Sequence, residues 1–225
     1  MFTTRSMLRA IRPIKQPRCN YSSSIETKEL VYPESQSSNH HDLVSFLEYS
    51  SRIDMDTKST VFVGTHYEYT VQTAFERFGM SLKRIGGASD YGIDLLGTWA
   101  LPSLPQPLKV IIQCKAFARK VEPSQARELE GAFVGAPPGW RGSGVLGLLV
   151  SQKSATKGVR EALGRSRWPM GYVLCGSDGK ILQMIWNRRA EEEGLDGIGV
   201  GLKYAGSDRT KREVVLTWKG ETIEP

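Results

Sequence analysis

The first strong pattern along the chain is an apolar stripe at helical spacing ahead of Gly79. Its members recur every three or four residues and are Tyr67, Val71, Ala74, Phe75 and Phe78. This period lines one face of a helix with apolar side chains, and a glycine directly after it is a stop signal. The sequence therefore predicts a helix over about residues 66–79.

Continuous and alternating apolar segments follow this helix, and their lengths favour strands. The predicted strands cover residues 82–86, 92–99, 108–115 and 145–150, and residues 171–186 form two more around a turn at Ser177 to Gly179. Pro123 at a first helical position begins a second helix, whose buried stripe includes Leu129 and Phe133. A basic helix lies within residues 153–168. This order predicts an α/β fold in which helices flank a mixed central sheet.

The same elements define the expected domain organisation. One domain covers residues 59–187, and residues 188–225 pack on it as a glycine-rich loop and a C-terminal β-hairpin extension. Polar residues dominate 25–58, which predicts a linker interrupted by a short helix from Leu43 to Tyr49.

Residues 1–24 differ in composition from the rest of the chain, because they contain five basic residues and no acidic one. This amphipathic, arginine-rich and acid-poor pattern is typical of a mitochondrial transit peptide, and it predicts a protein of the mitochondrial matrix. A disordered basic arm for nucleic acid is the alternative. No apolar run reaches the length of a membrane-spanning helix, so we expect no membrane insertion.

Overall charge says little about partners. The formal net charge is +6 from 30 basic and 24 acidic residues, but five of the basic residues lie in the first 24, so the remainder is nearly neutral. Local charge is more informative, because Lys153, Lys157 and Arg160 line one face of the basic helix. Phosphate contacts suit such a face, and an ordinary solvated surface is the alternative. The cysteines form neither a disulfide framework nor a zinc-ligand spacing.

Three polar residues on two neighbouring predicted strands carry the candidate chemistry. Gln113 and Lys115 are two apart and therefore share one face of their strand. If the turn between the strands is centred near Ser103, Asp94 falls opposite Gln113. A carboxylate and an amide oxygen suit Mg²⁺ or Mn²⁺, and a lysine beside them can stabilise charge on a phosphoryl group. The set predicts a metal-dependent phosphodiesterase site.

At this point the chain resembles the PD-(D/E)xK nuclease superfamily, and within it the Mrr-type restriction endonuclease-like group. The resemblance rests on GGASDYGID at residues 86–94 and on the Gln-x-Lys strand at 113–115. It implies a restriction-endonuclease-like core, with Asp94 in the place of the metal-binding aspartate, Gln113 in that of the D/E residue and Lys115 in that of the lysine. Gln113 departs from the superfamily pattern and agrees with the Mrr-like branch. The fungal "required for respiratory growth" mitochondrial proteins, which carry this domain, are similar over about residues 59–219.

Each candidate also has a structural interpretation. The superfamily usually adds an acid from a preceding helix, and Glu68 is the candidate. Thr65-x-x-Glu68 also matches a capping box, and the two roles are compatible. Asp90 and Gly92 suit the shaping of a bend, and Lys115 alone is compatible with a solvated strand end.

Three functions are consistent with these observations. The favoured one is a mitochondrial nuclease that hydrolyses phosphodiester bonds, with DNA as its partner, and serves respiratory growth or mitochondrial genome maintenance. The second is a catalytically silent nucleic-acid-binding protein on a nuclease fold. The third is an assembly factor of the respiratory machinery. Enzymes of the resembled superfamily that cut both strands often pair, so a homodimer through the terminal hairpin is a further expectation.

Overall fold

The computed structural model describes residues 30–33, 38–87, 92–116, 119–204 and 212–223. Within them, six strands form one mixed sheet in the order β1-β2-β3-β4-β5-β6. The strands are β1 (Met80–Arg84), β2 (Leu95–Trp99), β3 (Leu108–Lys115), β4 (Val145–Ser151), β5 (Met170–Cys175) and β6 (Ile181–Trp186). β1, β2 and β3 form an antiparallel meander, β3, β4 and β5 are parallel, and β6 returns antiparallel. The predicted α/β fold with a mixed central sheet is confirmed.

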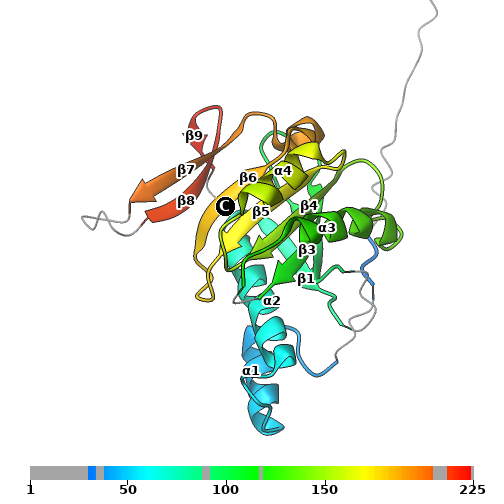
Figure 1. The fold of residues 1–225 in the computed structure, drawn as a ribbon, viewed down its shortest axis with the longest axis vertical. Coiled ribbons are helices and arrows are strands. Elements are labelled where there is room, and N and C mark those ends of the chain that lie inside the picture. Colours follow the sequence, from blue (N-terminus) through cyan, green and yellow to red (C-terminus); the bar gives the residue numbers. More distant parts are fainter. Residues whose placement is uncertain (1–29, 34–37, 88–91, 117–118, 205–211, 224–225) are drawn as a thin grey trace, which may run out of the picture. The chain divides into compact units, whose positions relative to one another are not determined.

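Helices cover both faces of this sheet (Figure 1). The longer helices are α1 (Leu43–Arg52), α2 (Thr60–Glu76), α3 (Pro123–Gly135) and α4 (Lys157–Arg165). The predicted apolar stripe of α2 packs into the main core through Tyr67, Val71 and Phe75. The crossover helices α3 and α4 lie on the opposite face, because two successive parallel connections in one direction place their helices on the same side.

β4 shows why both faces need cover. All seven of its residues are buried, as expected for a parallel strand between two helical layers. Leu148 and Val150 belong to the core under α2. On the other face, a Cβ atom at Gly147 would lie 2.7 Å from the Phe133 ring, so the glycine allows α3 to approach the sheet closely.

The start of α2 differs from the prediction. The helix begins at Thr60, with Ser59 as its N-cap accepting a hydrogen bond from Phe62 N at 3.1 Å. Residues 60–63 are largely β-branched or aromatic and lack the helical stripe, so the pattern alone placed the start too late. Phe62 instead packs on Phe46 of α1, with ring centroids 5.4 Å apart. Tertiary packing therefore extends the helix by more than a turn.

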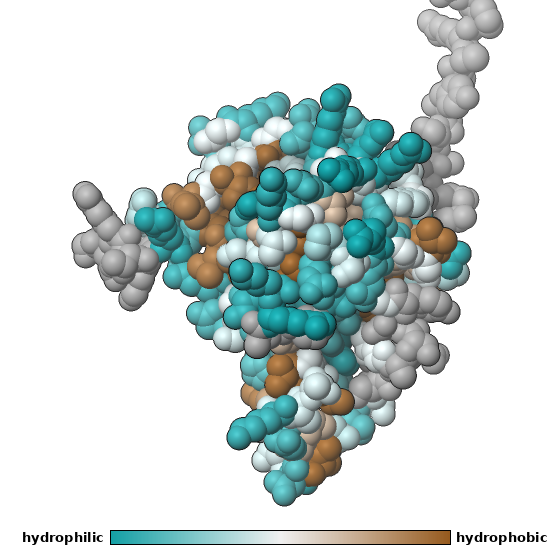
Figure 2. Space-filling model, viewed as in Figure 1, coloured by the Kyte–Doolittle hydropathy of each residue, from teal (hydrophilic) through white to brown (hydrophobic). Residues whose placement is uncertain are grey.

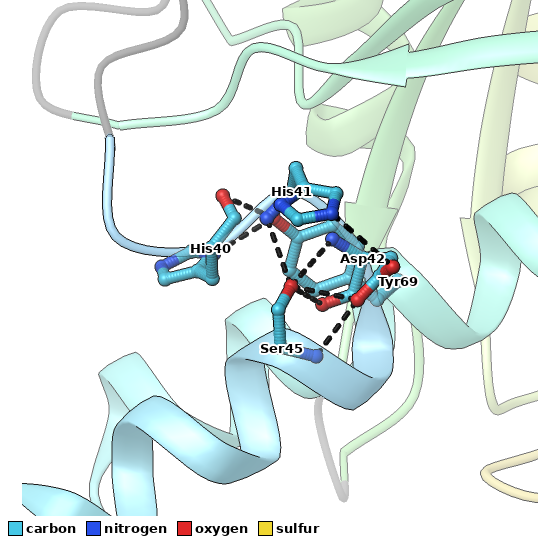
Figure 3. Close-up of polar contacts among 5 residues, drawn as sticks. All are labelled: His40, His41, Asp42, Ser45 and Tyr69. Carbon is cyan, nitrogen blue, oxygen red and sulfur yellow. Dashed lines mark hydrogen bonds and ion pairs between the residues drawn. The ribbon is translucent and has the colours of Figure 1, made fainter.

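α1 begins at Leu43 as predicted and continues to Arg52. Asp42 caps it, because its carboxylate accepts from Ser45 N at 2.7 Å and from Ser45 Oγ at 2.6 Å (Figure 3). The buried ring of His40 joins this turn to α2 through a 2.7 Å hydrogen bond with the Tyr69 hydroxyl. The residues before α2 are thus fixed against it by both polar and aromatic contacts.

The C-terminal extension is a second, small sheet. It contains β7 (Ile198–Tyr204), β8 (Arg212–Trp218) and β9 (Glu221–Thr222), in that order. The predicted hairpin of β7 and β8 is confirmed, and β9 adds a short third strand. Val214 and Leu216 join the main core, whereas Leu202 and Tyr204 are exposed. Between β6 and β7 lie the short α5 (Arg188–Ala190) and a π-helical turn, Glu191–Leu195.

Candidate functional site

The register of β2 and β3 places Asp94 as the sequence predicted. Leu95 pairs with Ile112, so one further step sets Asp94 opposite Gln113. Backbone bonds hold Asp94 from two sides, because its N–H donates to Ile112 O at 2.9 Å and its carbonyl accepts from Ile85 N and Gly86 N. Its carboxylate accepts from Cys114 N at 2.6 Å. Asp94 is therefore fixed where β2 begins and β3 ends.

Gln113 and Lys115 meet a partner that the sequence analysis missed. Glu128 of α3 accepts from Gln113 Nε2 at 2.8 Å and from Lys115 Nζ at 2.9 Å, through the same oxygen. Both strand residues therefore face α3, and the prediction that they share one face of their strand is confirmed. The available signal for Glu128 was an acid beside the buried stripe of the helix that follows β3, because Gln125 and Leu129 are buried.

The contact with Glu128 also determines which way the Gln113 amide points. A carboxylate only accepts, so the nitrogen must be the atom that faces it. The other atom, Gln113 Oε1, is buried and has no hydrogen-bond partner among the described residues. An unpaired buried carbonyl oxygen costs about 1–3 kcal/mol, and a ligand that contacted this atom would offset that cost.

Glu68 lies in the middle of α2, and the predicted capping box is wrong because the helix begins at Thr60. Instead of a backbone donor, Glu68 binds Arg84 of β1, with 2.5 Å between Oε2 and Nε. Both side chains are largely buried, at 13% and 12% exposed. Arg84 was also missed, because the pairing joins residues on two elements with no sequence signal of contact.

Two glycines allow the candidate site residues to lie close to the backbone. A Cβ at Gly86 would lie 3.2 Å from Glu68 Oε2 and 3.4 Å from Asp94 Oδ1, so both carboxylates border one glycine. Gly92 has a φ of 73°, and a Cβ there would lie 3.1 Å from Gln113 Nε2. Gly92 thus shapes the bend as predicted, while Asp90 lies outside the described residues.

The carboxylates of Asp94 and Glu68 affect the pKa of the Cys114 thiol. Burial raises the pKa of its thiol well above the ordinary value, and the negative charges of Asp94 and Glu68 raise the pKa further. The thiol therefore stays protonated near neutral pH and is neither a nucleophile nor a soft metal ligand.

The donor set fits a hard divalent cation. It offers the Asp94 carboxylate, the unpaired Gln113 Oε1 and the Glu68 carboxylate, which is paired with Arg84. Mg²⁺ and Mn²⁺ take oxygen ligands from one or two carboxylates together with carbonyls and water. Within the described ranges no cluster of three or more histidine, cysteine or acidic residues could hold a metal ion.

The basic residues are placed differently from their prediction. α4 begins at Lys157 after the N-cap Thr156, so Lys153 precedes the helix and the predicted three-residue helical face is wrong. Lys153 lies two residues beyond Ser151, which pairs with Lys115. It is therefore close in sequence to the same end of the sheet. Lys157 and Arg160 are exposed on α4, and Lys157 pairs with Glu161 at 3.8 Å.

Comparison with known proteins places the whole arrangement in one family. Residues 59–106 and 103–200 match the family model described as "Required for respiratory growth protein 7". The chain belongs to this family. The matched residues of the required for respiratory growth protein 7 family include Glu68, Asp94, Gln113 and Lys115.

Individual relatives agree with the family match. A mitochondrial protein of Schizosaccharomyces pombe is 34% identical over 155 residues, which cover 67% of this chain and 61% of that protein. Required for respiratory growth protein 7, mitochondrial, of Vanderwaltozyma polyspora is 31% identical over 140 residues, or 44% of this chain and 55% of that protein. The protein of the same name in Saccharomyces cerevisiae is 28% identical over 157 residues, or 51% and 65%. The chain thus spans less than two thirds of these relatives. No solved structure matches it.

Proposed function

We propose that this protein is a Mg²⁺- or Mn²⁺-dependent nuclease with a PD-(D/E)xK core of the Mrr-like type, acting on DNA in the mitochondrial matrix. The observation that carries the proposal is the meeting of Asp94, Gln113 and Lys115 at one end of the sheet, with Gln113 Oε1 buried and unpaired among the described residues. The β1–β3 meander followed by α3, β4, α4 and β5 supports the proposed restriction-endonuclease-like core.

In this proposal Asp94 and Gln113 hold the cation, and Glu68 supports it from the α2 side while Arg84 balances the charge of Glu68. The cation would polarise the phosphate and lower the pKa of a water molecule. Asp94 needs little reorganisation to bind, since its backbone and one carboxylate oxygen are already fixed.

Lys115 supplies the positive charge that the reacting phosphate requires. Its side chain is 14% exposed, and Glu128 holds its ammonium group at 2.9 Å. A water oxygen forms the new bond to phosphorus and gives up one proton to solvent, while the bond to the leaving sugar oxygen breaks and that oxygen takes a proton from solvent. Lys115 stabilises the negative charge that gathers on the phosphoryl oxygens during this exchange.

The cellular role follows from the relatives. Several carry the words mitochondrial and required for respiratory growth in their names, and the first 24 residues have the composition of a transit peptide. We assign the nuclease to mitochondrial genome maintenance, on which respiratory growth would depend. No described helix has the length and apolar character needed to cross a membrane.

A catalytically silent nucleic-acid-binding protein is the second candidate, and the ion pair of Glu68 with Arg84 favours it. That pair engages one carboxylate, and Gln113 brings no charge to the site. Silent binding predicts nucleic acid affinity that falls steeply with salt and does not depend on Mg²⁺. An assembly factor of the respiratory machinery predicts no nucleic acid affinity even at low salt.

The deciding experiment is cleavage of supercoiled, linear and single-stranded DNA by the purified chain in Mg²⁺ and in Mn²⁺. Asp94→Asn and Lys115→Gln should each lower cleavage at least about a hundredfold, the usual cost of losing one charge-stabilising group. Glu213→Gln and Lys58→Gln are matched controls, because both residues are exposed outside the site. Undiminished cleavage by Asp94→Asn, or no cleavage by the folded protein, would refute the nuclease.

A further inference from the structure

A pocket rich in arginine lies where α4 ends and α5 begins. Its volume is about 390 Å³, and its charged lining consists of Arg165, Arg167, Arg188, Arg189 and Glu192. We call it the arginine pocket. The surface over α3 and α4 is largely hydrophilic in Figure 2.

One buried side chain builds the floor of the arginine pocket. Asn187 Nδ2 donates to Leu163 O and to Trp168 O, both at 2.9 Å. Its Oδ1 accepts from Met170 N at 3.1 Å and from Ala190 N at 3.0 Å. All of its polar groups are therefore used to join the end of α4, the start of β5 and the first turn of α5. The pocket exists before any ligand arrives.

The pocket carries excess positive charge. Glu192 binds Arg188 at 3.0 Å and Arg189 at 2.7 Å. Arg165 and Arg167 have no carboxylate within ion-pair distance in the part of the chain that the structure describes. One glutamate thus balances only part of the charge of four arginines.

The carbonyl groups at the end of α4 do not cancel this attraction. A helix C-terminus carries about half a negative charge and would repel an anion. Here Ser166 N donates to Ala162 O and Leu163 O, both at 3.1 Å, and Asn187 binds Leu163 O as well. These carbonyls are already engaged, and the charge of four arginines less one glutamate exceeds the remaining partial charge.

The arginine pocket and the candidate nuclease site lie at opposite ends of the parallel strands. Met170, which begins β5, hydrogen-bonds to the floor residue Asn187. Lys115, which ends β3, belongs to the candidate nuclease site. Because β3, β4 and β5 run parallel, these two ends are on opposite edges of the sheet.

We infer that the arginine pocket binds the phosphate group of a small phosphorylated molecule. Arginine matches phosphate geometry, because its planar fork donates two parallel hydrogen bonds to two phosphate oxygens. A concave pocket with a fixed floor suits one terminal phosphate, whereas a nucleic acid backbone is bound along an extended surface. This site does not depend on the proposed nuclease activity.

Calorimetric titration of the full chain tests the inference at constant ionic strength. The probes are inorganic phosphate, pyrophosphate, glycerol 3-phosphate and a blunt DNA duplex without terminal phosphates. We expect saturable binding of at least one small phosphate compound, and the comparison of inorganic phosphate with the ester shows which source is preferred. No saturable binding of any small phosphate compound would overturn the inference.

Matched variants locate the site. Arg167→Gln and Arg189→Gln should weaken binding by about 10- to 100-fold, the range expected for losing hydrogen bonds to a charged group. Arg52→Gln removes the same charge at an exposed position of α1 and should leave binding unchanged. Equal weakening by all three, or binding of the duplex alone, would overturn the inference. The Asp94→Asn variant should bind phosphate as the original chain does. Loss of cleavage and loss of phosphate binding therefore test the nuclease proposal and the arginine pocket separately.

Discussion

The charged side chains at the two ends of the parallel strands differ in how deeply they are buried. Around Asp94 the ion pair of Glu68 and Arg84 is largely buried, at 13% and 12% exposed, and Lys115 is 14% exposed. Around Asn187 they are open to water, with Arg188 at 87% and Arg189 at 55% exposed. We call these the carboxylate edge and the arginine edge.

The difference indicates what each edge is suited to do. Burying an ion is costly, and it is tolerated only where partners hold the group in a fixed geometry. Such fixed geometry is what catalysis requires, because preorganised charges need not rearrange during the reaction. Exposed arginines cost little and retain their freedom to meet a ligand, which suits binding.

The largest effect is expected when the buried ion pair is broken. Arg84→Met removes the cation that binds the buried Glu68 carboxylate and should lower the free energy of unfolding by about 3–5 kcal/mol. At the arginine edge, Arg167→Gln should change it by less than about 0.5 kcal/mol, because surface substitutions are usually neutral. Urea denaturation measures both values.

The double variant Arg84→Met, Glu68→Met tests the cause. If the cost of Arg84→Met comes from an uncompensated charge, removing that charge should recover most of the lost stability. A double variant no more stable than Arg84→Met would show that Arg84 acts through packing, for instance its contact 5.5 Å above the Tyr69 ring.

Glu128 is expected to act on the reaction through Lys115. Glu128→Gln should lower cleavage by about 10- to 100-fold, the usual effect of removing a residue that orients a functional one. A positioning role also predicts a changed pH profile of cleavage and partial rescue by Glu128→Asp. Glu130→Gln, in the same helix, is the matched control. An unchanged rate in Glu128→Gln would show that Lys115 needs no orientation.

The carboxylate edge shows how far sequence reasoning reaches. Asp94 and Gln113 were matched correctly because an antiparallel pair joined by a turn has one register once its centre is set, and Leu95 indeed pairs with Ile112. Pro123 likewise begins α3 as predicted, because its fixed φ suits the first helical turn.

What the sequence did not reveal are contacts between elements. Glu128 and Arg84 are ordinary charged residues in their own segments, and only the packing of α3 and α2 on the sheet brings them to Lys115 and Glu68. The arginine pocket was missed for the same reason, since its cations come from two segments about twenty residues apart. Residues 1–24, predicted to be a transit peptide, lie outside the described residues.

Two glycines allow the same substitution to be compared at both edges. Gly92→Ala should destabilise the fold by about 1–2 kcal/mol, because φ is 73° and the new Cβ would meet Gln113. Gly164→Ala, in α4 at the arginine edge, meets nothing within 4 Å and should stabilise by about 0.5–1 kcal/mol. Thermal unfolding shows the sign of each change. If both substitutions changed the stability in the same direction, the backbone at Gly92 would not be more constrained than the backbone at Gly164.

The smallest expected effect is a pH dependence of the free energy of unfolding. It comes from His40, which contacts Tyr69 of α2 near the carboxylate edge. Burial lowers the pKa of His40 below 6.5, and the positive charges of Arg84 and His41 lower it further. As the pH falls below about 6.5, the unfolded chain therefore takes up the proton first, and the free energy of unfolding decreases. His40→Gln should remove this decrease, whereas His41→Gln should retain it, because the His41 side chain is 85% exposed.

Both variants can be followed by denaturation between pH 5 and 8, a range chosen to span the ordinary histidine pKa of about 6.5. Because the arginines at the other edge keep their charge throughout this range, Arg167→Gln should leave the pH dependence as it is in the original chain. A flat profile in the original chain would show that the buried His40–Tyr69 contact tolerates a proton.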